Sequence, residues 1–349
     1  MIGEYVMPYV ISSSEKTRHS ASEHETKALL YLMSFMEYSA EIHYYIIDVF
    51  NDLTGMDRYG EKLWDVQSKA AKSNGPKAIG RELVTLFKNY ISEFSFNDYI
   101  LFVGGVSDSF RINPSINSFH IDNVKEKALK SMRDGLIEEA LAREYIASDK
   151  VTEENINLFL ENVLFVVDSM EASNYIKEIL KGHENIIPSE SILVSIFNEI
   201  RDEQSSKKNS ANIEGFSLSS PDDAVNLHRH LKTGEIKLLC LQRIIHRNPM
   251  DDGVPSPFIP IYTSFPEDQA DDMLMDCKLS LSKALFNNNL SDQYWALFEE
   301  TYSLILSYPN ADVNSIYKNI SSVTKNNCPD LDILSLKYFI AVIKEGIQK

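Results

Sequence analysis

The chain has 349 residues, of which 44% are hydrophobic and 24% charged, and its formal net charge is −17. That length allows two ordinary domains, each with its own core, and the composition excludes wholesale disorder. No secretory signal opens the chain and no stretch of about eighteen apolar residues occurs, so we expect a cytoplasmic protein without membrane contact. Three widely spaced cysteines indicate neither a disulfide framework nor a zinc site.

The acidic charge is unevenly distributed along the chain. Residues 1–120 hold 11 basic and 15 acidic residues, whereas residues 121–349 hold 23 and 36. Nucleic-acid binding depends largely on Lys and Arg that neutralise phosphates, so a local basic surface is expected in the first part rather than the second. We interpret the acidic second part as a solubilising surface, with a basic partner as the alternative.

The first part of the chain alternates helical and extended patterns. A helix is predicted from Ser20 or Ser22, where a serine N-cap precedes apolar residues at helical spacing. Residues 43–50 are β-branched and aromatic, which is typical of a strand. Asp57–Gly60 has the residues of a type I turn, and residues 63–70 follow as a second strand.

The pattern continues with one more helix and one more strand. An amphipathic helix is predicted from Lys77, and the short apolar run 99–103, ending at two glycines, favours a buried strand. The order helix, strand, strand, helix, strand predicts an α/β domain over residues 1–120.

Residues 121–349 are dominated by apolar positions spaced three to four apart. Such spacing predicts a mainly α-helical domain, and its segments are residues 124–144, 153–169, 173–180, 189–203, 221–244 and, after a proline-rich irregular break at 249–266, the remainder of the chain. The polar run 204–210 breaks this series and is predicted to be an exposed loop.

The second predicted strand carries an unusual set of polar residues. Alternation places Asp65, Gln67 and Lys69 on one face, while Trp64 and Val66 lie on the other. The apolar side supplies the buried face, so the acid, amide and amine project together. The alternative is that they form the solvent-facing side of an amphipathic strand.

A hairpin centred on the Asp57–Gly60 turn brings a second acid to this face. Depending on the loop, residue 52 pairs with residue 65 or with residue 67, and either register places Asp52 near Asp65 and Gln67. Carboxylate and amide oxygens are ligands suited to Mg²⁺, and a nearby ammonium stabilises charge on a phosphate. This combination predicts phosphodiester hydrolysis.

These residues and their context resemble the PD-(D/E)xK nuclease superfamily in its Gln-x-Lys variant, over residues 20–110. More closely, the segment is similar to the nuclease domains of bacterial anti-phage effectors of the CBASS and Lamassu kinds. The resemblance implies a restriction-endonuclease-like core, a mixed sheet flanked by helices. It also implies Mg²⁺ or Mn²⁺ as the cofactor.

Carried over by position, the resemblance implies that Lys69 is the catalytic lysine and that Gln67 stands where Glu or Asp is usual. Asp52 is then the metal-binding acid of the preceding strand, and Glu25 adds a ligand from the first helix. Glu25 has an alternative role as a first-turn acid that favours the helix dipole. Further candidates for the metal are the acids Asp48, Asp57 and Asp65.

Two departures from the family pattern concern the site itself. Gln67 is neutral, which weakens metal binding, and no proline precedes the candidate aspartate. Basic residues after the motif are candidate contacts to the phosphate backbone, with a solvated helix face as the alternative, and they are Lys72, Lys77, Arg81 and Lys88.

The sequence therefore predicts a metal-dependent endonuclease that cleaves DNA, an effector whose activity is gated. Gating is expected through residues 121–349, by an SMC-like or sensor subunit or by formation of a homo-oligomer. Two alternatives are an RNA-cleaving nuclease and a catalytically degenerate interaction subunit, which the neutral Gln67 favours.

Overall fold

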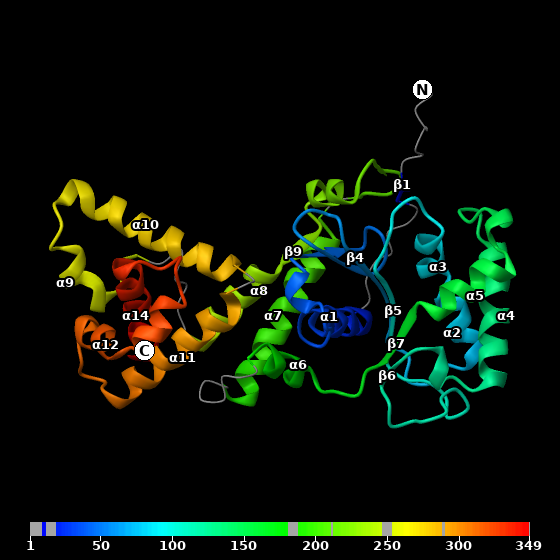
Figure 1. Cartoon of the computed structure of the whole chain (residues 1–349), viewed down its shortest axis with the longest axis horizontal. Helices are drawn as coiled ribbons and strands as arrows, with labels where there is room; N and C mark the ends of the chain where they lie inside the picture. Colours follow the sequence, from blue (N-terminus) through cyan, green and yellow to red (C-terminus); the bar gives the residue numbers. More distant parts are fainter. Residues whose placement is uncertain are drawn as a thin grey trace. The chain divides into compact units, whose positions relative to one another are not determined.

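The structure is a computed structural model that describes residues 9–11, 19–180, 188–210, 212–245, 253–287 and 290–348. The chain forms two compact units, residues 1–175 with 199–232 and residues 176–198 with 233–349 (Figure 1). The first contains a mixed sheet and helices and the second is helical, which confirms the predicted fold class at this level. None of the described helices meets the length and apolarity needed to span a membrane.

The first unit is organised around a seven-stranded sheet with the order β6-β7-β5-β4-β3-β2-β9. Strands β4, β5 and β7 run parallel, and the other neighbours pair antiparallel. The strands span Tyr44–Ile47 (β2), Leu53–Met56 (β3), Leu63–Lys69 (β4), Asp98–Val103 (β5), Ser118–Phe119 (β6), Val163–Val167 (β7) and His230–Lys232 (β9). A separate antiparallel pair joins Tyr9–Val10 (β1) to Ser217–Leu218 (β8).

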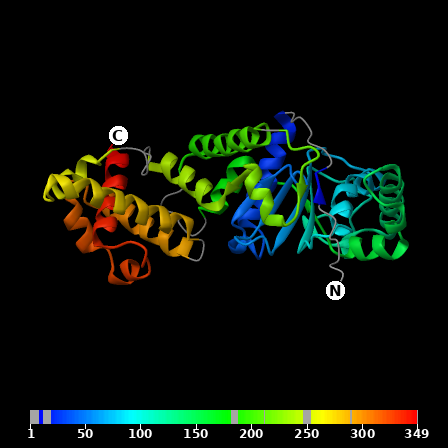
Figure 2. The same cartoon turned by 90° about the horizontal axis from the view of Figure 1, so that it is seen from above.

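Helices cover both faces of the sheet (Figures 1 and 2). Helix α1 (His19–Ser34) packs on β3 and β4, and α3 (Val84–Tyr90) packs on β4 from the other side together with α2 (Pro76–Glu82), α4 (Glu126–Ala142) and α5 (Glu153–Glu161). Because the central strands are enclosed by both layers, β4 and β5 are buried along almost their whole length. Short 3₁₀ turns connect these elements at Ser39–Glu41, Ile121–Asn123, Ser148–Lys150 and Pro221–Leu227.

Several predicted elements of the first unit differ in the structure. An additional strand, β3, stands between the two predicted strands, so the Asp57–Gly60 turn joins β3 to β4. The predicted helix from Lys77 is two short helices, α2 and α3. The helical pattern of 153–169 ends at residue 161, where the apolar run Val163–Val167 becomes β7.

Two further corrections concern residues after 200. The polar run 204–210, predicted as an exposed loop, continues helix α7 (Glu190–Lys208), and Gln204 and Lys208 are buried. The segment 221–244 is a 3₁₀ turn, the edge strand β9 and then α8 (Thr233–Ile245). The sheet-bearing unit consequently includes β7 and β9, which lie beyond the boundary expected at residue 120.

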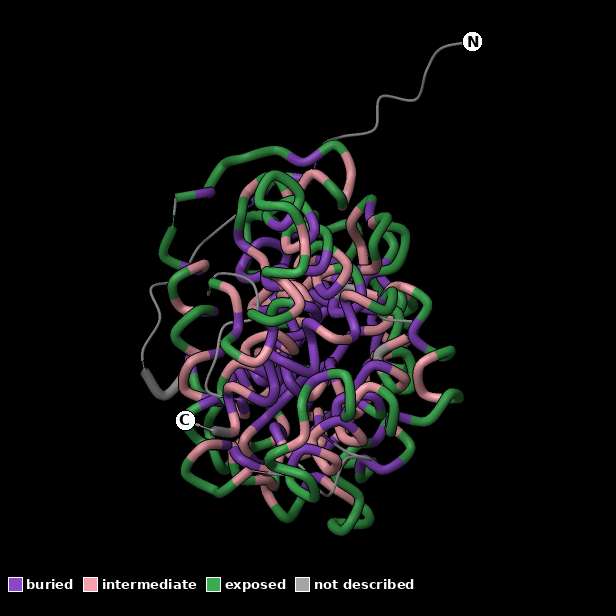
Figure 3. The backbone as a smooth tube through the Cα atoms, turned by 90° about the vertical axis from the view of Figure 1, so that its left-hand side faces the viewer, coloured by how far each residue is buried: buried purple, intermediate pink, exposed green. Residues whose placement is uncertain are grey.

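The second unit is a helical assembly around α14 (Ile333–Gln348). This helix is buried on nearly all sides, as expected for a strongly apolar central helix. It contacts α8, α10 (Glu267–Phe286), α11 (Ser291–Ser307), α12 (Val313–Asn319) and the 3₁₀ turn Ser256–Phe258. The other helices of this unit include α9 (Ile259–Tyr262) and α13 (Ser322–Asn326), neither of which has a buried residue. Figure 3 draws exposed residues in green and buried ones in purple. Helix α6 (Ala172–Ile179) begins in the first unit and ends in the second.

Candidate active site

The β3–β4 hairpin fixes the relative positions of the predicted site residues. Its register pairs Leu53 with Val66 and Thr54 with Asp65, so residue 52 falls opposite residue 67, the second of the two predicted registers. The turn is closed by the Asp57 carboxylate, which accepts hydrogen bonds from the backbone N–H of Glu61 and of Lys62 at 2.8 and 3.0 Å. Asp57 is therefore a turn residue and does not belong to the site.

Asp52 lies in the short connection between β2 and β3. Asp48 directly follows β2 and has a positive φ of 55°. Its N–H donates to the Asp52 carbonyl at 3.2 Å, which closes the bend between β2 and β3. The Asp52 Oδ2 atom accepts two hydrogen bonds of 2.8 Å, from the Gln67 amide and from the backbone N–H of Ser68. Asp52 is thus held against β4 by two donors.

Gln67 is oriented from both ends of its side-chain amide. Its nitrogen donates to Asp52, and its Oε1 atom accepts from the Thr85 hydroxyl of α3 at 2.6 Å. The side chain is buried, with 3% of its surface exposed. The predicted alternative of a solvent-facing polar strand is therefore wrong for Gln67, and also for Asp65, which is fully buried.

Lys69 stands at the exposed end of β4. Its side chain is 32% exposed and its Nζ atom lies 3.3 Å from the Glu82 carboxylate at the end of α2. Lys69, Asp52, Gln67 and Thr85 all line one pocket of about 100 Å³, together with Asp48–Asn51, Lys88 and Tyr145. The structure therefore brings the predicted lysine, amide and acid to one cavity.

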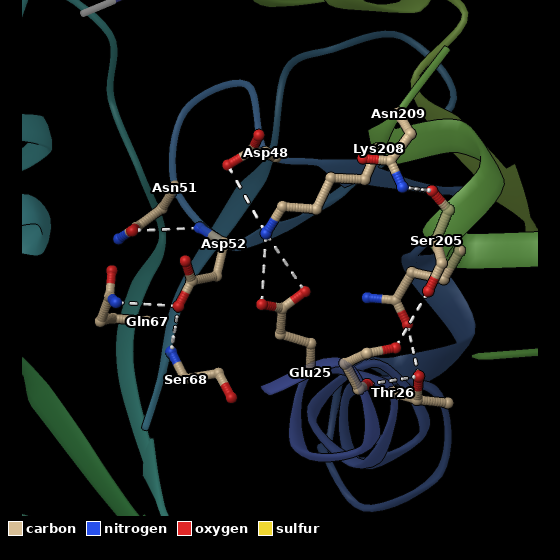
Figure 4. Close-up of polar contacts among 12 residues, drawn as sticks. Glu25, Thr26, Asp48, Asn51, Asp52, Gln67, Ser68, Ser205, Lys208 and Asn209 are labelled. Carbon is tan, nitrogen blue, oxygen red and sulfur yellow. Dashed lines mark hydrogen bonds and ion pairs between the residues drawn. The ribbon is translucent and has the colours of Figure 1, made fainter. Parts of the chain in front are cut away.

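Glu25 and Asp48 gather on the α1 side of the same loop (Figure 4). Glu25 lies in the second turn of α1 rather than the first, so the helix-dipole alternative does not apply. Its carboxylate pairs with Lys208 at 3.2 Å, and the Asp48 carboxylate lies 3.1 Å from the Arg229 guanidinium and 3.9 Å from Lys208. Asp48 belongs to both groups, because it also lines the pocket.

Burial dominates the electrostatics of these two acids. It raises the pKa of Glu25 to about 7, against the opposing effect of Lys208, and the pKa of Asp48 to about 6, against Lys208 and Arg229. Asp52 adds to both shifts as a neighbouring negative charge. Negative charge concentrated here requires a positive partner.

Asp65 belongs to a separate network beneath the pocket. Its carboxylate accepts hydrogen bonds from Asn89 at 2.6 Å and from Thr54 at 3.3 Å. Asn89 in turn accepts from the Tyr9 hydroxyl at 2.8 Å, and Lys88 donates to that hydroxyl at 2.6 Å. Asp65 is fully buried, so the solvated-charge interpretation is wrong, and it does not line the pocket that holds Asp52, Gln67 and Lys69.

The basic residues after the motif divide into two groups. Lys77 and Arg81 are exposed and pair with Glu138 of α4 at 2.7 and 3.5 Å, and Lys72 is exposed. Lys88 lines the pocket instead. Lys77 and Arg81 therefore already have a carboxylate partner, which weakens the phosphate-contact interpretation for them.

Sequence reasoning missed Thr85, Lys208 and Arg229. A signal for Lys208 exists, because Ile196, Ile200, Gln204 and Lys208 follow one another at four-residue steps on one helix face. Arg229 lies between two histidines in a short polar segment, and it is buried and carries the ion pair with Asp48. Thr85 has no sequence signal, since an isolated threonine on an amphipathic helix is unremarkable.

The donor set suits a hard divalent cation by type, because it consists of carboxylate and amide oxygens. Among the residues that the structure describes, however, no three His, Cys, Asp or Glu side chains converge as a ready metal cluster. The Lys208 ammonium lies among the carboxylates instead. Comparisons with protein-family models, curated proteins and solved structures gave no match.

Proposed function

We propose that the first unit is a metal-dependent nuclease that hydrolyses DNA phosphodiesters. The observation that carries this proposal is the joining of Asp52, Gln67 and Lys69 around one pocket, with Asp52 held by the Gln67 amide at 2.8 Å. The order of elements adds support, because α1, the β2–β4 hairpins, α2–α3 and the parallel β5 follow the order that the resemblance to PD-(D/E)xK nucleases implies.

Each side chain has a distinct task in this reaction. The carboxylates of Asp52 and Glu25 would hold Mg²⁺ or Mn²⁺, which supplies polarisation of a phosphate oxygen and a water of lowered pKa. The Gln67 amide oxygen, which now accepts from Thr85, would join them only after the amide turns over. Ser68 and Thr85 keep Asp52 and Gln67 in place through the contacts described above. The Lys69 ammonium neutralises charge that develops on the phosphate oxygens.

The chemical balance of the reaction is simple. A water oxygen forms a bond to phosphorus, the P–O ester bond on the opposite side breaks, and a water proton ends on the leaving oxygen. No oxidant or second substrate is required. The pocket has a volume of about 100 Å³, and since a water occupies about 30 Å³ of the liquid, it has room for a few water-sized groups.

The test uses the purified full chain with supercoiled plasmid, linear duplex DNA or RNA, in Mg²⁺, Mn²⁺ or EDTA. Asp52→Asn and Lys69→Met are each expected to lower the cleavage rate by about 100-fold or more. Asp108→Asn and Lys127→Met, which alter exposed residues of the same unit, are the matched controls. Cleavage that survives both site substitutions would exclude this site.

A non-catalytic interaction subunit is the second candidate. The specific observation in its favour is the ion pair between Glu25 and Lys208, which occupies one of the acids that a metal needs. Absence of cleavage by the wild type and also by a Lys208→Met variant, with both proteins folded, would favour this role. Cleavage of RNA and not DNA would change the substrate and leave the site intact.

We also propose that the acidic helical unit is where activity is gated, by a protein partner such as an SMC-like or sensor subunit or by a homo-oligomer. The support is the acidic excess of this unit itself, since residues 176–198 and 233–349 hold 12 basic and 18 acidic residues, which suits recognition of a basic surface. Sedimentation of the full chain alone and with the products of neighbouring genes is the direct measurement.

A further inference from the structure

The last residue of α7 places a buried cation in the acid cluster formed by Glu25, Asp48 and Asp52. The Lys208 side chain is only 4% exposed. Its Nζ atom lies 3.2 and 3.4 Å from the two carboxylate oxygens of Glu25 and 3.9 Å from Asp48 (Figure 4). Both oxygens of Glu25 therefore face the ammonium.

The environment keeps this ammonium charged. Burial alone lowers the pKa of a lysine, but here the carboxylates of Glu25, Asp48 and Asp52 outweigh it and raise the pKa of Lys208. Lys88, the other buried lysine near the pocket, shows the opposite result, because burial lowers its pKa to about 8 with only Asp65 opposing. The geometry gives the same result independently, because the ammonium lies 3.2 Å from the Glu25 carboxylate and 3.9 Å from that of Asp48.

A divalent metal needs the oxygens that Lys208 contacts. Mg²⁺ binds its oxygen ligands at about 2.1 Å in an octahedron, so a metal placed on the side of the Glu25 carboxylate where both oxygens face the ammonium would have to displace Lys208. On the basis of the proposed function, we propose that Lys208 is a built-in competitor of the catalytic cation. Its withdrawal from the acid cluster, by release of the end of α7, opens the site to the metal.

Polar contacts hold the end of α7 against α1, and water can replace them. They are polar pairs, in which Thr26 donates to Gln204 at 2.8 Å and the hydroxyls of Ser22 and Ser205 lie 3.0 Å apart. The Gln204 Nε2 atom is buried without a hydrogen-bond partner. Water replaces such contacts at little net cost, and the unpaired amide gains a partner on exposure.

Lys208 lies at the end of a helix whose residues are shared between the two units, which links Lys208 to ligand binding by the second unit. Helix α7 runs continuously through residues 190–208, of which 190–198 belong to the second unit and 199–208 to the first. A ligand that binds the second unit can therefore act on Lys208 through an unbroken helix. It shifts the equilibrium only as far as it prefers the released state.

The test measures Mn²⁺ binding to the full chain by calorimetry. Lys208→Met removes the ammonium and keeps a long side chain. It is expected to bind Mn²⁺ about tenfold or more tightly than wild type, because a larger fraction of the molecules has an acid cluster that is open to the metal. Lys208→Arg retains the charge and is expected to resemble wild type. Lys207→Met, one residue earlier on the same helix, is the matched control and is also expected to resemble wild type.

Two further variants test the competition by Lys208 even if Lys208→Met folds poorly. Gln204→Ala weakens the α1–α7 contact without changing any charge, and its Mn²⁺ affinity is expected to lie between those of wild type and Lys208→Met. Adding Asp52→Asn to Lys208→Met is expected to remove the gain, which places the ion at this site. Unchanged Mn²⁺ affinity in both Lys208→Met and Gln204→Ala overturns the proposal.

Plasmid cleavage by the same proteins separates the two proposals. Tighter Mn²⁺ binding without cleavage supports the competition by Lys208 and counts against the nuclease. Cleavage by wild type that Lys208→Met does not increase, with equal Mn²⁺ affinities, supports the nuclease and overturns the competition. Tighter binding together with faster cleavage supports both.

Discussion

The two units bury very different kinds of side chains. In the described part of the first unit, the buried charged residues include Glu25, Asp48, Asp65, Lys208 and Arg229. In the described part of the second, the buried polar or charged residues are only Thr233, Thr301, Ser335 and Lys344. Burying charge costs free energy even when it is paired, so the first unit keeps an arrangement that stability alone does not favour. The first unit therefore buries paired charges at a cost in stability, whereas the described part of the second unit buries almost only apolar side chains.

Each unit carries its own spectroscopic reporter for tests of this contrast. Trp64 lies in the first unit and Trp295 in the second, and both are buried. Urea unfolding of Trp64→Phe therefore follows the second unit through Trp295, and unfolding of Trp295→Phe follows the first through Trp64. Every stability prediction below is measured in the matching background.

The largest effect is expected from an apolar truncation in the second unit. Phe339 is fully buried in α14, with its ring 5.4 Å from that of Tyr294 and 6.2 Å from that of Phe298. Phe339→Ala is expected to lower the free energy of unfolding by about 4 kcal/mol, with no dependence on salt. The exposed Tyr308→Ala is the control, and equal losses for the two would contradict the assigned core.

A smaller loss is expected when a buried ion pair of the first unit is broken. Arg229→Met leaves the Asp48 carboxylate buried with Lys208 as its more distant partner at 3.9 Å, which is expected to cost about 3 kcal/mol. Adding Asp48→Asn, which tolerates the positive φ, is expected to recover part of that loss. A double variant as unstable as the sum of the singles would show that the pair is not coupled.

The sequence was sufficient for the parts of the first unit that depend on local patterns. The Asp57–Gly60 turn, the polar face of β4 and the approach of residue 52 to residues 65 and 67 all follow from short-range spacing, whereas the choice of residue 67 over residue 65 came from the structure. From these, the Asp52–Gln67 contact was predictable, although the additional strand β3 was not distinguished from β2.

Residues brought in from distant segments were not predictable in the same way. Lys208 contacts Glu25 across 183 positions of the sequence, and Arg229 contacts Asp48 across 181. A polar helix end such as 204–208 has the composition of a solvated loop, and only tertiary packing on α1 decides otherwise. β7 was missed for a similar reason, since a short apolar run fits a buried helix as well as a buried strand.

A third prediction concerns backbone contact in the second unit. A Cβ atom added at Gly346 of α14 would meet the Ile245 carbonyl oxygen at 1.8 Å. Alanine normally stabilises a helix relative to glycine, but Gly346→Ala is expected to lower the free energy of unfolding by about 2 kcal/mol through overpacking. Gly253→Ala, where an added Cβ meets nothing within 4 Å, is the matched control. A stabilised Gly346→Ala variant would contradict the close approach of α8 and α14.

Measured per pH unit, the smallest expected effect is a change in the pH dependence of the first unit's stability. Burial raises the pKa of Asp65 from 3.8 to about 7, so the folded state binds its proton more tightly than the unfolded state does. The resulting stability is complete below about pH 4 and is lost as the pH rises through 7. Since one proton is involved, the unfolding free energy of the first unit changes by at most about 1.4 kcal/mol per pH unit from this group. Asp65→Asn is expected to flatten the decline between pH 4 and 7 when Trp64 reports unfolding, whereas the exposed Asp108→Asn leaves it unchanged. Equal slopes for wild type and Asp65→Asn would mean that Asp65 is ionised in the folded protein, held so by Asn89, Thr54 and the charge of Lys88.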